Sequence, residues 1–152
     1  MDIRTTHVPG FKIGTAEDRE GLTGVTVFLA PEDGAAAGLD VRGCAPGTRE
    51  TDLLSPEKTV QKIHAVVLSG GSAFGLEADS GVMRYLAEQG IGFPVGDSAV
   101  PIVCGAVLFD LSIGDPHAFP DLEMGIKAAS AAGTDFPVGC YGAGTGASVG
   151  KL

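Results

Sequence analysis

Two glycine-rich stretches are the places where this sequence could most easily build chemistry. The first is Val66–Gly75 (VVLSGGSAFG), in which an apolar run is followed by Gly70, Gly71 and Ser72. If the run is a strand and a helix follows the glycines, backbone N–H groups at the helix start could bind a small anion or an oxyanion. A tight turn that only packs a helix against a sheet explains the same pattern, and both interpretations stay open.

The second stretch is Gly142–Lys151 (GAGTGASVGK), a run of small residues that ends in a lysine. It is not a phosphate-binding P-loop, because that motif needs glycine in place of Thr145 and serine or threonine in place of Leu152. In a crowded, partly desolvated place the pKa of a lysine falls, and the amine can act as a base or as a charge partner for a nucleophile. An exposed lysine explains the same residues, and composition alone favours that interpretation.

Residue types that commonly bind metals are scattered along the chain. They are His7, His64, His117, Cys44, Cys104 and Cys140. No CxxC pair and no histidine spacing typical of a metal site occurs, so the sequence predicts no metal, no cofactor and no disulfide framework. The cysteines are expected to be reduced and buried, and the histidines to lie on the surface or in a satisfied core position.

The charge balance argues against two classes of partner. Lysine and arginine number 10 and aspartate and glutamate 19, which gives a net charge of −9 over 152 residues. Nucleic acids and anionic membranes bind basic surfaces, so neither partner is expected. The first residues lack the apolar core of a signal peptide, and no apolar run is long enough for a membrane-spanning helix. We therefore expect an acidic cytoplasmic protein.

The elements that must position the glycine-rich stretches alternate between strand and helix. Strands are predicted at Leu22–Ala30, His64–Ser69 and Val100–Leu111, and helices at Ser72–Gln89 and Asp121–Ala132. The second strand should be buried on both faces, the third should break near Gly105, and Ser72 and Asp121 should cap the helices. The alternation predicts a single α/β (α+β) domain, whole or partial, over residues 1–152.

Weaker signals predict three further elements. Gly10–Gly14 should be a short extended start, and Ala36–Arg42 an antiparallel partner of the first strand. Pro56–Ile63 follows a serine and should form a short helix.

Four stretches together carry a resemblance to a known family. They are Arg42–Leu54 (RGCAPGTRETDLL), Leu68–Ala78 (LSGGSAFGLEA), Val100–Asp110 (VPIVCGAVLFD) and Gly142–Lys151 (GAGTGASVGK). In this order and spacing the chain resembles the DmpA-type family of L-aminopeptidases and D-esterases, which includes the endo-type hydrolases of nylon (6-aminohexanoate) oligomers. Each stretch alone is a weak signal, whereas the four in order are close to diagnostic.

The resemblance implies a self-processing hydrolase. Members are made as longer precursors that cut themselves once, which exposes a Ser or Thr nucleophile at the start of a second chain. The fold is an α/β/β/α sandwich, several protomers assemble, and amides or esters are hydrolysed through an acyl-enzyme. This sequence would supply the N-terminal part. Its partners would be the rest of the precursor or a second chain carrying the nucleophile, further copies of itself in a homo-oligomer, and a small peptide or amide substrate.

The resemblance assigns roles to few residues of this sequence. Lys151 matches the lysine beside the nucleophile and is the expected catalytic residue. Phe109 matches an active-site position where the nylon-oligomer hydrolases carry tyrosine; without a hydroxyl, only its ring or backbone can serve. On the backbone argument given above, Gly70, Gly71 and Ser72 complete the expected substrate or oxyanion pocket. The nucleophile and the oxyanion asparagine of the family are expected outside this sequence.

Two hypotheses of different class follow. In the first, the chain is the N-terminal portion of an amide hydrolase. Whether that enzyme is an aminopeptidase or another amidase stays open, because the founding aminopeptidase differs at CAPGTRE and GGSAFGLEA. In the second, it is a non-catalytic fragment, or a domain that binds a small anion at the Ser69–Ser72 turn. A part of an enzyme should expose a large apolar face, whereas a binding module should be a well-behaved monomer.

Overall fold

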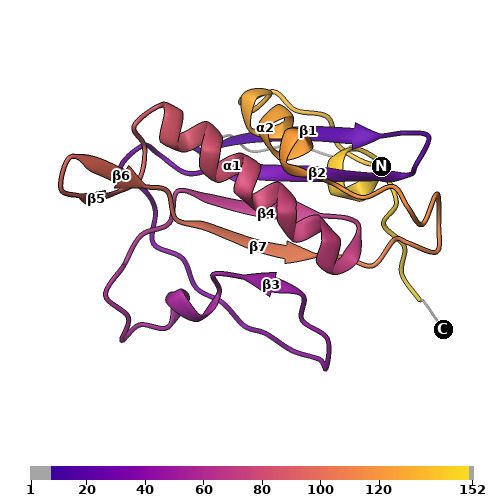
Figure 1. The fold of residues 1–152 in the computed structure, drawn as a ribbon, viewed down its shortest axis with the longest axis horizontal. Coiled ribbons are helices and arrows are strands. Elements are labelled where there is room, and N and C mark those ends of the chain that lie inside the picture. The colour runs from indigo at the N-terminus through magenta and orange to yellow at the C-terminus, as the bar shows by residue number, and fades with distance from the viewer. Residues whose placement is uncertain (1–7, 151–152) are drawn as a thin grey trace.

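A five-stranded sheet with two α-helices on one face is the main feature of the computed structural model, which describes residues 8–150 (Figure 1). The strands lie in the order β1, β2, β4, β7, β3. Their bounds are β1 Lys12–Asp18, β2 Thr23–Leu29, β4 Ala65–Ser69, β7 Val103–Val107 and β3 Thr48–Arg49. The central pair, β4 and β7, is parallel, and the other neighbouring strands are antiparallel. The predicted mixed α/β class is confirmed.

The α-helices, α1 (Glu77–Glu88) and α2 (Leu122–Ser130), cover one face of the sheet and pack against each other. They approach closely because glycines lie where they cross. A Cβ atom at Gly81 would lie 2.0 Å from the carbonyl oxygen of Leu122, and one at Gly125 would lie 2.1 Å from a carbonyl oxygen of α1. Within residues 8–150, no helix has the length and hydropathy that crossing a bilayer requires.

The hydrophobic core lies between these helices and the sheet. Its fully buried members are small or β-branched: Val25, Val27, Val67, Ala78, Val82, Val103, Ala128 and Ala129. Burying one valine side chain contributes about 1.5–3 kcal/mol, so this layer is the main source of stability. Helix α1 turns one face to this core, with Leu86 buried and Tyr85 partly buried against it.

The two helices begin differently from each other. The Asp121 carboxylate accepts a hydrogen bond from the backbone N–H of Met124 at 2.9 Å, which confirms the predicted cap of α2. The predicted cap at Ser72 is wrong, because a 3₁₀ helix, η2 (Ser72–Leu76), precedes α1 and has no side-chain cap. Ser72 has a left-handed backbone, with φ of 53°, and its N–H donates to Leu108.

Two predicted elements are absent from the described part of the chain. Ala36–Arg42 forms no strand, because both edges of β2 are already occupied by β1 and β4. Pro56–Ile63 forms turns and an extended stretch instead of a helix, since Ile63 exchanges backbone hydrogen bonds of 2.9 Å with Ala35. The helical turn in this region lies earlier, at the 3₁₀ helix η1 (Asp52–Leu54).

The predicted strand Val100–Leu111 is divided, but not at Gly105. A small hairpin of β5 (Phe93–Val95) and β6 (Ser98–Val100) comes first, and the break falls at Pro101 before β7 begins. Proline has no N–H to donate to a strand partner, which explains the position of the break. Gly105 instead lies inside β7, where it is paired on both sides.

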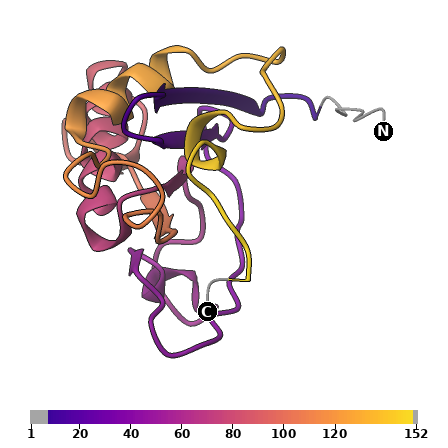
Figure 2. The same ribbon diagram turned by 90° about the vertical axis from the view of Figure 1, so that its right-hand side faces the viewer.

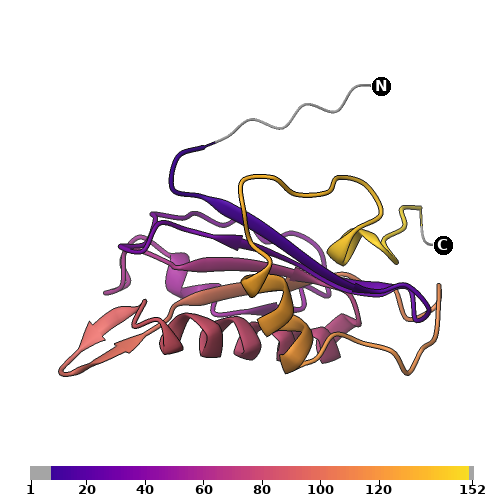
Figure 3. The same ribbon diagram turned by 90° about the horizontal axis from the view of Figure 1, so that it is seen from above.

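The face of the sheet opposite the helices is largely open. Figures 2 and 3 show that, within residues 8–150, the segment after α2, which includes the 3₁₀ helix η3 (Gly142–Gly144), crosses this face. Phe28 and Leu68 are 36% and 39% exposed there. The expectation that β4 is buried on both faces is therefore wrong for this chain. Partly exposed apolar side chains on this face agree with the apolar face expected of a part of an enzyme, and its extent stays a prediction.

Candidate functional site

The carboxyl ends of the parallel strands β4 and β7 gather most of the predicted site residues. Gly70, Gly71 and Ser72 follow β4, and Phe109 follows β7 after one intervening residue. The two turns touch, because the N–H of Ser72 donates to the carbonyl oxygen of Leu108 at 3.0 Å. Ligands bind beyond the carboxyl ends of strands in open α/β sheets, so this is the end where a site is expected. Lys151 lies outside the described residues.

A buried aspartate that the sequence analysis did not single out joins these turns. One oxygen of Asp110 accepts a hydrogen bond of 2.6 Å from the N–H of Gly71, and the other accepts one of 2.8 Å from the hydroxyl of Thr23. Both Asp110 and Thr23 are buried. An acidic residue at the end of the apolar run that forms β7 was the available signal, whereas nothing local marked Thr23.

The backbone donors of the Gly70–Ser72 turn are engaged within the chain. The N–H of Gly70 donates to Gly24 at 2.9 Å, that of Gly71 to Asp110, and that of Ser72 to Leu108. The Asp110 carboxylate thus accepts the hydrogen bond that an external anion would need from Gly71. These bonds agree with a turn that packs segments together, and the predicted oxyanion role of the turn stays a prediction.

Aromatic side chains surround this end of the sheet. Phe109 is 51% exposed. Phe74 stacks on Phe119, with ring centroids 4.6 Å apart and planes inclined by 17°. Phe119 also lies against the glycine turn, because a Cβ atom at Gly71 would be 2.6 Å from the Cβ of Phe119. The site therefore has an apolar, partly exposed rim suited to contact with a substrate or with another part of the protein.

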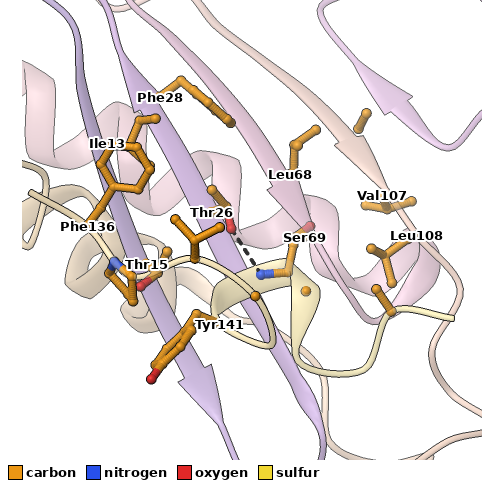
Figure 4. Close-up of a pocket in the computed structure, with 17 residues that line it drawn as sticks. Ile13, Thr15, Thr26, Phe28, Leu68, Ser69, Val107, Leu108, Phe136 and Tyr141 are labelled. Carbon is orange, nitrogen blue, oxygen red and sulfur yellow. Dashed lines mark hydrogen bonds between the residues drawn. The ribbon is translucent and has the colours of Figure 1, made fainter. Parts of the chain in front are cut away.

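The small-residue segment that leads to Lys151 is attached to the open face of the sheet. The N–H of Ala143 donates to the hydroxyl of Thr26 at 3.1 Å, drawn as a dashed line in Figure 4. The N–H of Gly142 donates to the carboxylate of Glu17, also at 3.1 Å. Farther along, a Cβ atom at Gly146 would lie 3.0 Å from the nearer carboxylate oxygen of Asp110. The two glycine-rich stretches of the sequence thus meet at Asp110.

A cavity of about 470 Å³ opens beside this segment on the same face (Figure 4). Its apolar lining includes Ile13, Phe28, Leu68, Val107, Phe136 and Val138. Its polar lining includes Thr15 and Thr26 on the β1–β2 hairpin, and Tyr141. The Tyr141 ring is held by the guanidinium of Arg19, which lies 4.8 Å from the ring centroid. The cavity can accept an apolar group close to the carboxyl end of β4.

Among residues 8–150, no group of three or more potential metal ligands is close enough together to hold an ion. His64 is buried and its Nδ1 accepts a hydrogen bond of 3.1 Å from the N–H of Ile102, and burial lowers its pKa. Cys104 is buried, but Cys44 and Cys140 are exposed, so the expectation of buried thiols is wrong for those two. The absence of a metal or a cofactor stays a prediction.

A second buried carboxylate lies on the helix side of the sheet, away from these turns. Asp79 of α1 faces Gly105 of β7, where a Cβ atom would lie 1.9 Å from a carboxylate oxygen. Neither oxygen of Asp79 has a hydrogen-bond partner among the described residues. Burial raises the pKa of Asp79 to about 7, although the nearby guanidinium of Arg49 opposes the rise.

Comparison with known proteins identifies the protein family of the chain. Residues 4–152 match the family model described as peptidase family S58. An uncharacterised aminopeptidase of Mycobacterium tuberculosis is 50% identical over 129 residues, which are 85% of this chain and 37% of that protein. A 6-aminohexanoate-oligomer endohydrolase of Paenarthrobacter ureafaciens is 38% identical over 145 residues, 95% of this chain and 38% of the hydrolase.

Solved structures agree with these sequence matches. A protein of Pyrococcus horikoshii OT3 superposes with a TM-score of 0.69 at 25% identity, over 93% of this chain and 44% of that protein. A β-aminopeptidase of Burkholderia sp. superposes with a TM-score of 0.64 at 20% identity, over 91% and 41%. The chain therefore has the fold of part of the β-aminopeptidase, and it spans less than half the length of each of these proteins.

Proposed function

Because the chain belongs to peptidase family S58, we propose that it is the N-terminal portion of a self-processing peptidase or amide hydrolase. Its sheet and two helices would form one α/β layer of the sandwich. The remaining part, or a second chain, would supply the other layer and the Ser or Thr nucleophile. The complete protein consists of this chain together with that part.

The observation that carries this proposal is the open apolar face of the sheet. Phe28 and Leu68 are more exposed than side chains in the middle of a sheet usually are, and a 470 Å³ apolar cavity lies beside them. A second sheet packed on this face would bury them at the usual distance of about 10 Å between sheets. The carboxyl ends of β4 and β7 would then border the junction of the two layers.

In the proposed reaction the nucleophile hydroxyl attacks the carbonyl carbon of the amide, and its proton passes to a base. The amine leaves with a proton, and water then hydrolyses the acyl-enzyme to release the acid. Lys151 is proposed as the group that tunes the nucleophile or accepts its proton. Phe109 and the turn of Gly70, Gly71 and Ser72 would line the substrate pocket. No step requires a metal or a cofactor.

The first test is intact mass spectrometry of the complete protein under denaturing conditions. Self-processing predicts two species, of which the smaller begins with Ser or Thr. Amine release from a small amide substrate should accompany the cut. Lys151→Ala should abolish hydrolysis without altering the fold, whereas Lys127→Ala, at an exposed position of α2, should leave it intact. Full activity of Lys151→Ala would remove the proposed role of that lysine.

A matched pair of substrates separates an aminopeptidase from another amidase. One peptide carries a free N-terminal amine and the other is the same peptide acetylated at that amine. Cleavage of only the free peptide would indicate an aminopeptidase, and cleavage of both would indicate a broader amidase. Size-exclusion chromatography of the same sample tests the further proposal that the protomers form a homo-oligomer. A cytoplasmic location is part of the same proposal.

The alternative of a small-anion-binding domain has less support. The N–H groups of Gly70, Gly71 and Ser72 donate to oxygens of the chain itself, so an anion would have to displace Asp110 or the carbonyl groups. The open apolar face also disagrees with a self-contained binding module. Titration with inorganic phosphate, followed by thermal unfolding, would reveal any such binding as a rise in the unfolding temperature.

A further inference from the structure

We infer that Asp110 is a positioning residue that holds the small-residue segment before Lys151 and the turn around Phe109 in their working arrangement. This inference rests on the function proposed above, because it gives the segment a role in amide hydrolysis. The observation behind it is that one buried carboxylate joins parts of the chain that are far apart in sequence.

The hydrogen bonds of Asp110 connect two such parts. Its partner Thr23 begins β2 and lies 87 residues earlier, and its partner Gly71 lies in the turn after β4, 39 residues earlier. The donors differ, since one is a hydroxyl and the other a backbone N–H. Hydrogen bonds to an ionised acceptor are about twice as strong as those between neutral groups. The carboxylate therefore fixes the ends of β2, β4 and β7 relative to one another.

Asp110 also contacts the segment that leads to Lys151. A Cβ atom at Gly146 would lie 3.0 Å from Oδ2 of Asp110 and 1.9 Å from the carbonyl oxygen of Leu22. The backbone of Gly146 is therefore pressed between the carboxylate and the start of β2, with no room for a side chain. Any shift of the carboxylate would change where the segment leaves the sheet.

A second attachment lies a few residues earlier in the same segment. The N–H of Ala143 donates to Thr26 and the N–H of Gly142 donates to Glu17. These hydrogen bonds fix the first part of the segment, and the close packing at Gly146 restricts the path of the part that follows. The contact at Gly146 is the one nearer to Lys151 in sequence. Asp110 therefore acts through the backbone, which makes it a positioning residue and not a catalytic one.

The same carboxylate orders the strand end that bears Phe109. The backbone on one side of Phe109 is held by Leu108, whose N–H donates to Ser69 at 2.9 Å and whose carbonyl oxygen accepts from Ser72. On the other side, Asp110 is itself held by the hydrogen bonds that it accepts from Thr23 and Gly71. Loss of the carboxylate would release one of these two restraints.

The test uses the complete protein with substitutions at Thr23, because Asp110→Ala could fail to fold. Thr23→Val keeps the shape of the side chain but removes the donated hydrogen bond, and Thr23→Ser keeps the hydroxyl. The first readout is the separate measurement of kcat and KM for amide hydrolysis. The second is the rate at which acetylating reagent modifies Lys151, followed by peptide mass spectrometry, with Lys127 as the internal control.

We expect Thr23→Val to lower kcat about tenfold with little change in KM. The rate of acetylation of Lys151 should change by about threefold or more, while that of Lys127 stays constant. Thr23→Ser should restore both values toward those of the unaltered protein. A purely structural role would lower the amount of folded protein without changing kcat per active site or the relative labelling of the two lysines.

The outcomes separate this inference from the function on which it rests. If the unaltered complete protein hydrolyses no amide, the proposed function fails, and the labelling of Lys151 alone decides whether Asp110 positions the segment. If Thr23→Val matches the unaltered protein in labelling and in any measurable kcat, the inference is overturned. A loss of activity that Thr23→Ser does not restore would also overturn it.

Discussion

Replacing the buried Asp79 by asparagine should stabilise the protein. The stabilisation should appear only when the pH rises above the acidic range. Asp79 is 1% exposed and packs against Gly105, and its carboxylate oxygens have no hydrogen-bond partner among the described residues. Asparagine has almost the same shape and carries no charge. The substitution therefore removes the unfavourable burial of an ion and leaves the packing between α1 and β7 unchanged.

The size of the effect follows from the pKa of Asp79, which burial raises from 3.8 to about 7. At pH values between these two, the folded protein keeps a proton that the unfolded chain has lost. The free energy of unfolding therefore falls as pH rises, by about 1.4 kcal/mol per pH unit, and the fall ends above pH 7. The whole shift corresponds to about 4 kcal/mol, of which about 3 kcal/mol falls between pH 5 and pH 8.

The assay is thermal unfolding of the complete protein and of Asp79→Asn at pH 5 and at pH 8. For a protein more than twice the length of this chain, 1 kcal/mol corresponds to about 1–2 °C, so the advantage of the variant should grow by about 3–6 °C between the two pH values. Asp97→Asn is the matched control, because it makes the same substitution at an exposed position of the β5–β6 hairpin. Its effect should not grow in this way.

Two results would refute this reasoning. An equal difference between Asp79→Asn and the unaltered protein at both pH values would mean that Asp79 does not exchange a proton in this range on unfolding. A variant that is less stable at pH 8 would mean that the ionised carboxylate has a partner, most simply the guanidinium of Arg49, whose loss outweighs the relief of burial.

Three further predictions concern packing and reactivity. Gly70→Ala should strongly lower the unfolding temperature measured by scanning calorimetry, because the new Cβ atom would lie 2.0 Å from the Asp110 carboxylate. The control Gly38→Ala should leave it unchanged, because a Cβ atom there meets nothing within 4 Å. Under the proposed function, Leu68→Asp should prevent the remaining part from packing on the open face, and mass spectrometry of the complete protein should then show no processing. Cys104, whose pKa is raised to about 11 by burial, should react with iodoacetamide at pH 8 only after denaturation, unlike the two exposed cysteines.

The sequence predicts the parts of the fold that have strong local signals. The apolar run His64–Ser69 followed by two glycines indicates β4, and the periodic stripe through Val82 and Leu86 indicates α1. The aspartate at position 121 indicates the start of α2. Each of these signals lies within one turn or one strand, which is why a single sequence can reveal it.

The remaining elements depend on pairing between distant segments. β1 (KIGTAED) is a largely polar strand, so the sequence predicts only a short extended stretch at Gly10–Gly14. The full length of the strand is set by its pairing with β2 over seven residues. The same pairing, with β4 on the other edge, leaves no place for a strand at Ala36–Arg42. Local periodicity indicates that a strand exists but not which neighbours it has.

The candidate site, like the fold, combines residues that local sequence signals reveal with residues that only the folded structure brings together. The turn of Gly70 and Gly71 could be found from its glycines, and Phe109 from the family resemblance. Asp110 and Thr23 could not be paired from the sequence, because the hydrogen bond between them spans 87 residues. The left-handed backbone of Ser72, which rules out its predicted role as a helix cap, depends on the crossing with Leu108 and has no local signal.

The separation of 87 residues between Thr23 and Asp110 also bears on the order in which the protein folds. The β1–β2 hairpin closes a short loop, whereas the hydrogen bond between Thr23 and Asp110 forms only after β4, α1 and β7 are in place. We therefore expect this end of the sheet to form after the folding transition state, so that weakening it speeds unfolding more than it slows folding. Under the proposed function, self-cleavage would then have to wait for nearly complete folding, and an incompletely folded precursor would stay uncut.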